Sequence, residues 1–304
     1  MGAASPLLTV VPLILGFIGP GIVIWLRNQG RRRAERRSPI TKDMLRPPGY
    51  SLSLRLENLQ FEADSLLFPL FLGPFVGYTI WLTVLHFGKQ KSGLALGLII
   101  AIVVLGVTGF LSRKLLRMLK EIDLIKLGID GELFTGQELD QLMRHGCRVF
   151  HDVPFPYGNI DHVVVSNSGV YSVNTKTCRK HKEGGSAEVF IDHTNNTIRF
   201  PDRKWQIPTS QLEAESNWLR KYLTSAVGNP VNVEPILALP GWHISKRIGK
   251  GTVFVINPVS PRKFFVHRRQ VHSPEDIQRI AHQLEQLVRD IKPSQRLKDG
   301  WEGE

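Results

Sequence analysis

Three long apolar runs fill most of the first third of the chain, whereas apolar and polar positions alternate over short distances in the rest. The runs are residues 7–26, 66–87 and 93–111, and none contains a charged side chain. A helix of about 20 residues covers a bilayer core. The pattern therefore predicts three transmembrane helices in a membrane region over residues 1–111. A buried helical hairpin of a soluble protein is the alternative for the second and third runs.

Basic residues flank these runs unevenly and predict their orientation. The first run is followed by six arginines, Arg27, Arg31, Arg32, Arg33, Arg36 and Arg37. Only Lys89 and Lys91 lie between the second and third runs. The third run is followed by Arg113, Lys114, Arg117 and Lys120. Cytoplasmic loops carry an excess of Lys and Arg. We therefore expect a multi-pass protein of a plasma or inner membrane, with its N-terminus outside and the soluble part in the cytoplasm. A cleaved signal peptide is disfavoured because residues 1–6 carry no positive side chain.

The segments around the apolar runs have mixed character. Arg46-Pro47-Pro48-Gly49 breaks any helix within residues 41–64. The leucines of that segment fit either a membrane surface or packing against the soluble part. Residues 112–127 are basic and amphipathic and predict a helical connector. A soluble module is expected over residues 128–292, followed by a polar tail over residues 293–304.

The clearest β pattern in the soluble module is a hairpin. Two β-branched runs, 160–165 and 170–173, flank a turn of Ser, Asn, Ser and Gly at 166–169. Antiparallel pairing brings the start of the first run close to the end of the second. Asp161 lies at that start, and Asn174 and Lys176 lie at that end. An acid on one strand and a polar residue two positions before a lysine on the next is an arrangement typical of metal-dependent nucleases.

The remaining pattern predicts an α/β domain. A helix is expected from Gly131-Glu132 to Gly146, with a first strand at 148–153. The later predictions are a second hairpin turning at Asn195-Asn196, a helix over 210–223, strands over 231–239 and 252–256, and a helix capped by Ser273-Pro274 that runs to Ile291. This order predicts a mixed sheet flanked by helices.

Composition narrows the function classes. The 304 residues have a formal net charge of +12 and a sequence pI of about 9.9. A basic chain of this kind fits nucleic acid or an anionic membrane surface. The two cysteines, Cys147 and Cys178, are too few for a disulfide framework or a cysteine zinc site. Ser166 and Ser168 have no His/Asp pattern beside them, so a hydrolase triad is not predicted.

Several motifs in order resemble the nuclease-related domain (NERD) family. They are Gly131-Glu132-x-x-Thr135-Gly136-Gln137-x-Leu139, Val149-Phe150-His151-Asp152, Asn159-Ile160-Asp161-His162-Val163-Val164-Val165 and Gly169-Val170-Tyr171-x-Val173-Asn174-Thr175-Lys176-Thr177. The resemblance covers about residues 128–179, and the later Pro240-Gly241-Trp242 also resembles members of the family. It implies a restriction-endonuclease-like fold of the PD-(D/E)XK superfamily: a mixed sheet flanked by helices, here preceded by three transmembrane helices.

The resemblance also implies a site for phosphodiester hydrolysis. Such hydrolysis uses a divalent ion, Mg²⁺ or Mn²⁺, which prefers carboxylate oxygens. Asp161 would be one metal ligand, and Glu132 matches the acidic residue that family members carry on the first helix. Lys176 would orient the attacking water or stabilise developing charge. His162 follows Asp161 on a regular strand and is expected on the opposite face, and His151 and Cys147 are interpreted as structural.

Position 174 departs from the superfamily pattern, because Asn174 stands where Glu or Asp is expected two residues before the lysine. Its amide oxygen is a possible ligand without charge, so weaker metal affinity is expected. Two functions follow. One is a membrane-anchored nuclease acting on DNA or RNA. The other is a catalytically inactive NERD-like module that binds nucleic acid or a protein partner at the membrane.

Basic clusters provide candidate phosphate contacts. Arg179, Lys180 and Lys182 follow the hairpin, and a second group comprises Arg262, Lys263, Arg268 and Arg269. Such groups hold a phosphate backbone without reading sequence. A surface that faces anionic lipid of the bilayer is the alternative for both groups.

Overall fold

The computed structural model describes residues 22, 25, 40–87, 93–180 and 186–293. The chain divides into two units, one formed by residues 1–44 with 292–304 and the other by Leu45–Ile291. The second unit is described below. The first predicted span, 7–26, lies outside the described residues except at positions 22 and 25, as does Lys182.

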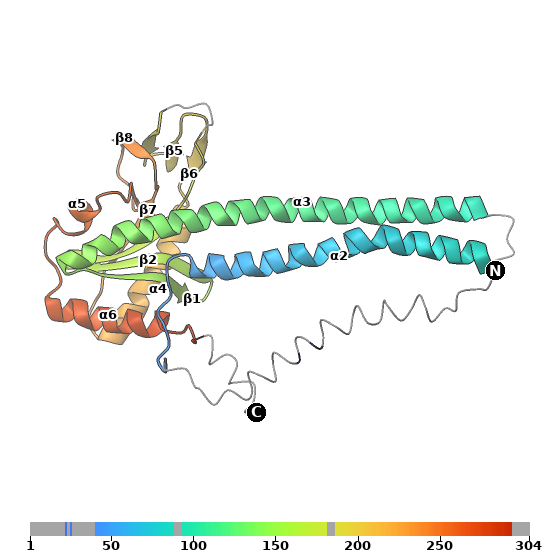
Figure 1. Cartoon of the computed structure of the whole chain (residues 1–304). Coiled ribbons are helices and arrows are strands. Elements are labelled where there is room, and N and C mark those ends of the chain that lie inside the picture. Colours follow the sequence, from blue (N-terminus) through green and yellow to red (C-terminus); the bar gives the residue numbers. More distant parts are fainter. Residues whose placement is uncertain (1–21, 23–24, 26–39, 88–92, 181–185, 294–304) are drawn as a thin grey trace. The chain divides into compact units, whose positions relative to one another are not determined.

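Two long helices, α2 (Tyr50–Phe87) and α3 (Gly93–Asp140), form an antiparallel hairpin (Figure 1). Within the described residues, these two helices are long and apolar enough to cross a membrane. In each helix we call the most apolar stretch of 18 residues its apolar window; only 6% of this window is buried in α2 and 0% in α3. The windows therefore differ from the core helices of a soluble protein. The two helices approach closely at Gly77, where an added Cβ would lie 2.6 Å from a Val104 methyl group.

Beyond the apolar windows, α2 and α3 pack through a small core of their own. Ala63 of α2 and Met118 and Ile122 of α3 are buried, with Leu56 and Leu59 packed against them. Part of the leucine-rich segment after residue 50 thus packs on α3, whereas Leu54 and Phe61 are exposed. α3 continues without a break through residues 112–140, so Gly131-Glu132 lies inside a helix and does not begin one.

The main sheet has five strands in the order β1-β2-β3-β7-β9. Their bounds are β1 Arg148–Phe155, β2 Gly158–Ser166, β3 Gly169–Thr175, β7 Val233–Ala238 and β9 Phe254–Ile256. β1, β2 and β3 pair antiparallel, and β3, β7 and β9 pair parallel. The predicted hairpin and the predicted mixed sheet are confirmed. The last turn of the α3 segment continues into a short 3-10 helix, η1 (Gln141–His145), which ends at Gly146 with φ +82°.

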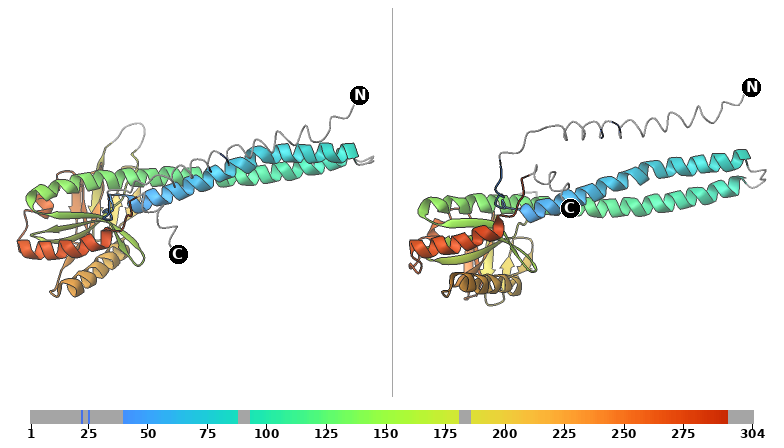
Figure 2. Two further views of the ribbon diagram at one scale, coloured as in Figure 1. Left: turned by 60° about the horizontal axis from the view of Figure 1, so that its bottom comes forward. Right: turned by 90° about the horizontal axis from the view of Figure 1, so that it is seen from below.

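Helices cover both faces of this sheet (Figures 1 and 2). α4 (Thr209–Val227) and α6 (Pro274–Val288) bury one face, where Val163 and Val165 meet Leu219 and Leu284. The end of α3, with η1 and the short α5 (Arg262–Phe265), covers the other face around Val164 and Tyr171. Strand alternation explains this division, because successive residues of β2 point to opposite faces. α6 begins as predicted with Ser273 in a capping box and ends before the expected Ile291.

A second sheet of four strands has the order β6-β5-β4-β8. Its strands are β4 Glu188–Asp192, β5 Thr197–Arg199, β6 Lys204–Gln206 and β8 His243–Ile248. β4 and β5 confirm the second predicted hairpin, whereas β6 and β8 are additional to the predicted strands. The inner face of this sheet packs on Leu237 and Val255 of the main sheet and on Trp242. The sheet is labelled at β5, β6 and β8 in Figure 1.

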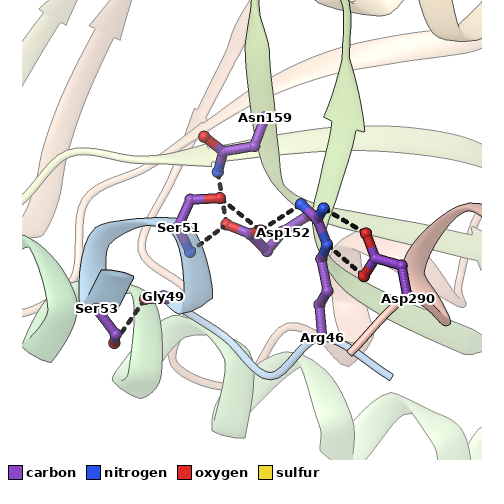
Figure 3. Close-up of polar contacts among 7 residues, drawn as sticks. All are labelled: Arg46, Gly49, Ser51, Ser53, Asp152, Asn159 and Asp290. Atoms are coloured by element: carbon purple, nitrogen blue, oxygen red, sulfur yellow. Dashed lines mark hydrogen bonds and ion pairs between the residues drawn. The ribbon is translucent and has the colours of Figure 1, made fainter. Parts of the chain in front are cut away.

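A buried ion pair joins the segment before α2 to the sheet (Figure 3). Asp152 of β1 has no exposed side-chain surface and accepts from Arg46 Nη1 at 2.9 Å. Ser51 donates to the same carboxylate through Oγ at 2.7 Å and through its backbone N–H at 3.1 Å, and Asn159 Nδ2 donates at 2.9 Å. The other side of the guanidinium binds Asp290 beyond α6, with contacts of 2.9 and 2.6 Å.

Removing the charge of Asp152 is expected to destabilise the protein strongly. Asp152→Asn keeps a residue that tolerates the left-handed backbone at this position, φ +51°. It leaves Arg46, 16% exposed, without its buried counter-charge. We expect a loss of about 3–5 kcal/mol in the free energy of unfolding. The measurement is urea denaturation of the detergent-solubilised chain.

The control is Asp290→Asn, which removes the exposed partner of the same guanidinium. Exposed ion pairs contribute about 0–1 kcal/mol. Equal losses in the two variants would contradict the dominant role of the buried carboxylate.

Candidate active site

The β2–β3 hairpin places Asp161 and the end of β3 together. The register pairs His151 with His162 and Val153 with Ile160, on either side of Asp152 and Asp161. Asp152 has a left-handed backbone there, and the backbone N–H of Thr175 donates to Asp161 Oδ2 at 2.7 Å. The last residue of β3, Thr175, is therefore hydrogen-bonded to the side chain of Asp161. This contact orients the Oδ2 atom of the Asp161 carboxylate.

Lys176 follows directly at the point where β3 leaves the sheet. Its backbone N–H donates to the carbonyl of Ala238 in β7 at 3.0 Å, and its side chain is exposed. The neighbouring strand thus fixes the main chain of Lys176, while its side chain extends into solvent. The strand end supplies a positive group beside Asp161, because the charge of Lys176 lowers the pKa of that carboxyl.

Glu132 enters the same region from α3. A Cβ on Gly131 would fall 1.7 Å from Thr177 Oγ1, so only a glycine lets α3 lie this close to the segment after β3. Glu132 is 6% exposed, and its Oε2 has no hydrogen-bond partner. Burial raises the pKa of Glu132, the charges of Asp161 and Asp152 raise it further, and Lys176 opposes the rise.

A third carboxylate, Glu215, comes from α4 and is the residue that the sequence patterns missed. It is 1% exposed. Asn174 Nδ2 donates to its Oε2, and Gln211 Nε2 donates to its Oε1 at 2.9 Å. Burial raises the pKa of Glu215, whereas Gln211, Asn174 and Lys176 lower it. A carboxylate from a helix therefore lies beside the position where the superfamily pattern has an acid on the strand.

One signal in the sequence points to Glu215. Leu212, Ser216, Leu219 and Leu223 form the buried stripe of α4 at helical spacing, and Glu215 falls on that stripe. Glutamate is rarely fully buried without a partner. A charged residue on the apolar face of a predicted helix thus marks a polar contact, although the spacing does not identify Asn174 as the partner.

Lys176 is the positive charge shared by the three carboxyls. It lowers the pKa of Glu132, Asp161 and Glu215, which come from α3, β2 and α4. Burial is the largest cause of the raised pKa in each of the three. One exposed ammonium does not offset two buried acids and one half-buried acid. The site therefore holds an excess of acidic groups, a condition that favours protons or a cation.

The donor types at this site fit a magnesium or manganese ion. Both ions take carboxylate oxygens and retain waters. Glu132 Oε2 is a buried oxygen without a partner, which a cation would satisfy. In the described part of the chain, however, no three His, Cys, Asp or Glu side chains are grouped closely enough to form a ready ligand set. Asn174 directs its amide nitrogen to Glu215 and acts here as a hydrogen-bond donor.

A chain of hydrogen bonds lies behind the site, on the face of the sheet that α3 covers. His151 Nε2 lies 3.1 Å from Asp140 Oδ1, and the Nδ1 atoms of His151 and His162 are 2.9 Å apart. His162 Nε2 lies 3.3 Å from Thr175 Oγ1. Burial, followed by the charge of His151, holds the pKa of His162 well below its usual value. His162 thus supports Thr175, whose N–H orients Asp161.

The predicted basic contacts lie in different environments. Arg179 Nη2 donates to the carbonyl of Asp123 in α3 at 3.3 Å, and the Lys180 ammonium lies 5.5 Å from the centre of the Trp242 ring. Arg268 pairs with Glu234 at 2.8 Å and stacks on the Phe264 ring, so it links elements of the core. Arg262 and Lys263 lie on α5.

Ser166, Ser168 and Cys147 have structural roles, as their contacts and burial show. Ser166 and Ser168 bond to each other at 2.9 Å, and Ser168 also bonds to Tyr171. Cys147 is buried, and burial raises the pKa of its thiol to about 11.

Comparison with known families identifies the domain. Residues 127–240 match the family model of the nuclease-related domain. This matched range, referred to below as the NERD domain, extends from the last turns of α3 to two residues beyond β7. Glu132, Asp161, Asn174, Lys176 and Glu215 all lie inside the matched range. No curated protein and no solved structure matches the chain.

The stability of the domain should depend on pH through Asp161. Burial raises its native pKa above the ordinary value of about 4. Stability is therefore fully present below pH 4 and is lost as pH rises toward the raised native value. Asp161→Asn removes this loss and keeps an oxygen for the Thr175 N–H. In metal-free buffer the variant should be more stable than the parent by about 1–3 kcal/mol at pH 9, with a smaller difference at pH 5.

Thermal denaturation in EDTA at the two pH values measures this effect. Asp202→Asn, an exposed ion-pair residue elsewhere on the domain, provides the control. A difference between Asp161→Asn and the parent that is the same at pH 5 and pH 9 would contradict the raised native pKa.

Proposed function

We propose that the NERD domain is a divalent-metal-dependent nuclease that hydrolyses phosphodiester bonds of DNA or RNA. The observation that carries the proposal is the position of Lys176 among three carboxyl groups from three different elements, the buried Glu132 and Glu215 and the half-buried Asp161. The match to the nuclease-related domain supports it, and a PD-(D/E)XK-like arrangement is consistent with that family.

Each residue has a role in this proposal that follows from its contacts. Asp161, Glu132 and Glu215 would hold Mg²⁺ or Mn²⁺, which supplies neutralisation of phosphate charge and a water of lowered pKa when bound. Lys176 carries the positive group that faces the developing charge on the phosphate oxygens. The N–H of Thr175 orients Asp161, and Asn174 and Gln211 orient Glu215. Asn174 acts in this scheme through Glu215.

A catalytically inactive module that binds nucleic acid or a protein partner is the second candidate. It is favoured by the absence of a ready group of three metal ligands among the described residues. The two candidates differ in one property, since only the nuclease gives metal-dependent cleavage products.

The proposed location is a membrane with the domain on its cytoplasmic side. The exposed apolar windows of α2 and α3 support insertion of the hairpin. The predicted span at 7–26 would add a third crossing, and the basic residues that follow the first and third runs support a cytoplasmic domain.

Glu215→Gln is expected to abolish cleavage. It keeps the size of the side chain and its contact with Gln211 but removes the charge from a site that must hold a cation. We expect at least a hundredfold loss in the rate of cleavage of a fluorescent DNA or RNA oligonucleotide with Mg²⁺ or Mn²⁺, because removal of a group that stabilises transition-state charge costs about 10²–10³ in rate.

Glu213→Gln is the matched control on the same helix. Glu213 accepts a hydrogen bond from the hydroxyl group of Thr252, which is not a residue of the candidate site. Retained metal-dependent cleavage in Glu215→Gln would remove Glu215 from the site. No cleavage by the parent protein with either metal would favour the inactive module.

Exchange of the carboxylate between strand and helix provides a sharper test. Asn174→Glu alone would set two acids against each other, because Asn174 donates to Glu215. We expect it to lower both stability and activity. The double variant Asn174→Glu with Glu215→Gln restores one acid and one amide with their positions exchanged, and should recover part of the cleavage lost in Glu215→Gln. Additive losses in the double variant would contradict the direct coupling of the two residues.

A further inference from the structure

A row of cations crosses the outer face of the second sheet. The register pairs Lys204 of β6 with Arg199 of β5, Arg199 with Phe190 of β4, and Phe190 with Lys246 of β8. Residues paired directly across neighbouring strands share one face of a sheet. We call these four residues the basic row. Three of its four members are cations, one on each of β6, β5 and β8.

The basic row faces away from the core. The neighbouring residues Ile191 and Ile198 are buried against the main sheet, so the alternate positions point outward. Lys204, Arg199 and Lys246 are exposed, and Phe190 is half-buried. A β-bulge between Val189 and Phe190 shifts the register of β8, which aligns Lys246 with Phe190.

Phe190 holds two of the cations in place. The Arg199 guanidinium lies 5.3 Å from the ring centre and the Lys246 ammonium lies 6.0 Å from it. Cations at these distances from a ring are attracted by its negative face. The charges are therefore positioned on the sheet before any ligand binds, which lowers the entropy cost of binding.

The cations of the basic row are only partly neutralised by the protein. Asp192 contacts Arg199 at 3.7 Å and also accepts from Asn195. Within the described residues, Lys204 and Lys246 form no ion pair. Asp192 and the second acidic residue of β4, Glu188, lie on either side of Phe190, and Glu188 is paired with His243 of β8. The face thus retains a positive excess.

We propose that the basic row binds the phosphodiester backbone of a nucleic acid and extends the substrate-binding surface of the domain. The choice of nucleic acid as the ligand rests on the proposed function. Neighbouring strands are about 4.8 Å apart, so three strand spacings place the cations within about 14 Å. Duplex DNA presents one negative charge per about 1.7 Å of its axis, so several phosphates fall within that distance.

The basic row connects to the candidate active site through the segment after Lys176. Arg179 and Lys180 follow that lysine, and Arg203 Nη2 donates to the carbonyl of Arg179 at 3.4 Å. Lys204, the first member of the row, is the next residue after Arg203. A backbone that reaches Lys176 can therefore continue along these cations. Lys246 lies beyond the range matched by the family model, which ends at residue 240.

An anionic membrane is a less suitable ligand for this face. The domain contacts α3 at Asp123 through Arg179. Asp123 lies 12 residues beyond the end of the apolar run at Leu111, or about 18 Å along a helix. This separation exceeds the Debye length of about 8 Å at physiological ionic strength.

The test measures binding of the full chain in detergent micelles to fluorescein-labelled single-stranded and duplex oligonucleotides by anisotropy. EDTA is present throughout, so no metal-dependent turnover occurs. The variants are Lys204→Ala, Lys246→Ala and their combination. The control is Lys221→Ala, which removes the same charge from the exposed face of α4. We expect about a threefold weaker affinity for each single variant and about tenfold for the double variant, with the salt slope reduced by about 1 per lysine.

Two results would overturn the proposal. One is a double variant that binds both oligonucleotides as tightly as Lys221→Ala and with the same salt slope. The other is a double variant that loses binding to vesicles containing phosphatidylserine but keeps its affinity for the oligonucleotides. Because binding is measured without metal, an inactive parent protein that shows the expected losses of affinity would refute the nuclease and leave the basic row in place.

Discussion

The buried carboxylate of Asp152 is the constraint on which the arrangement of this domain depends. Burying an unpaired charge costs several kcal/mol, so the carboxylate requires partners that are fixed in position. Arg46, Ser51 and Asn159 provide them, and Arg46 reaches on to Asp290 (Figure 3). The start of α2 is therefore fixed to β1 and to the end of α6. The same carboxylate also raises the pKa of Glu132 and Asp161, so one buried charge influences both the attachment of the hairpin and the candidate site.

The candidate site contains groups that destabilise the folded protein, which is typical of a functional site. Glu132, Asp161 and Glu215 each carry a pKa raised by burial, and only Lys176 supplies a positive charge to all three. Perturbed titration of this kind clusters at functional sites. The unpartnered Oε2 of Glu132 adds a second unfavourable group at the same place. A bound divalent cation would offset both. The basic row on the second sheet would complement this acidic site, because it would bind phosphates that the carboxylates alone repel.

Local patterns predicted the parts of the fold that depend on neighbouring residues. The alternation around the turn at 166–169 predicted β2 and β3, and Ser273-Pro274 predicted the start of α6. The contacts missed from sequence join distant positions. Asn174 and Glu215 are 41 residues apart, and Arg46 and Asp152 are 106 residues apart. β6 and β8 were missed because short, basic strands lack an apolar alternation. The superfamily pattern placed the missing acid on the strand, whereas the buried acid beside that position comes from α4.

The most direct test of the central claim is the position of a bound metal ion. Crystals of the full chain grown with MnCl₂ at alkaline pH and measured near the manganese absorption edge would locate the ion by its anomalous signal. The account predicts one manganese peak bound by Asp161 with Glu132 or Glu215, next to the Lys176 side chain. An absence of manganese at these carboxylates, in crystals where Lys176 and Asp161 are ordered, would contradict the account.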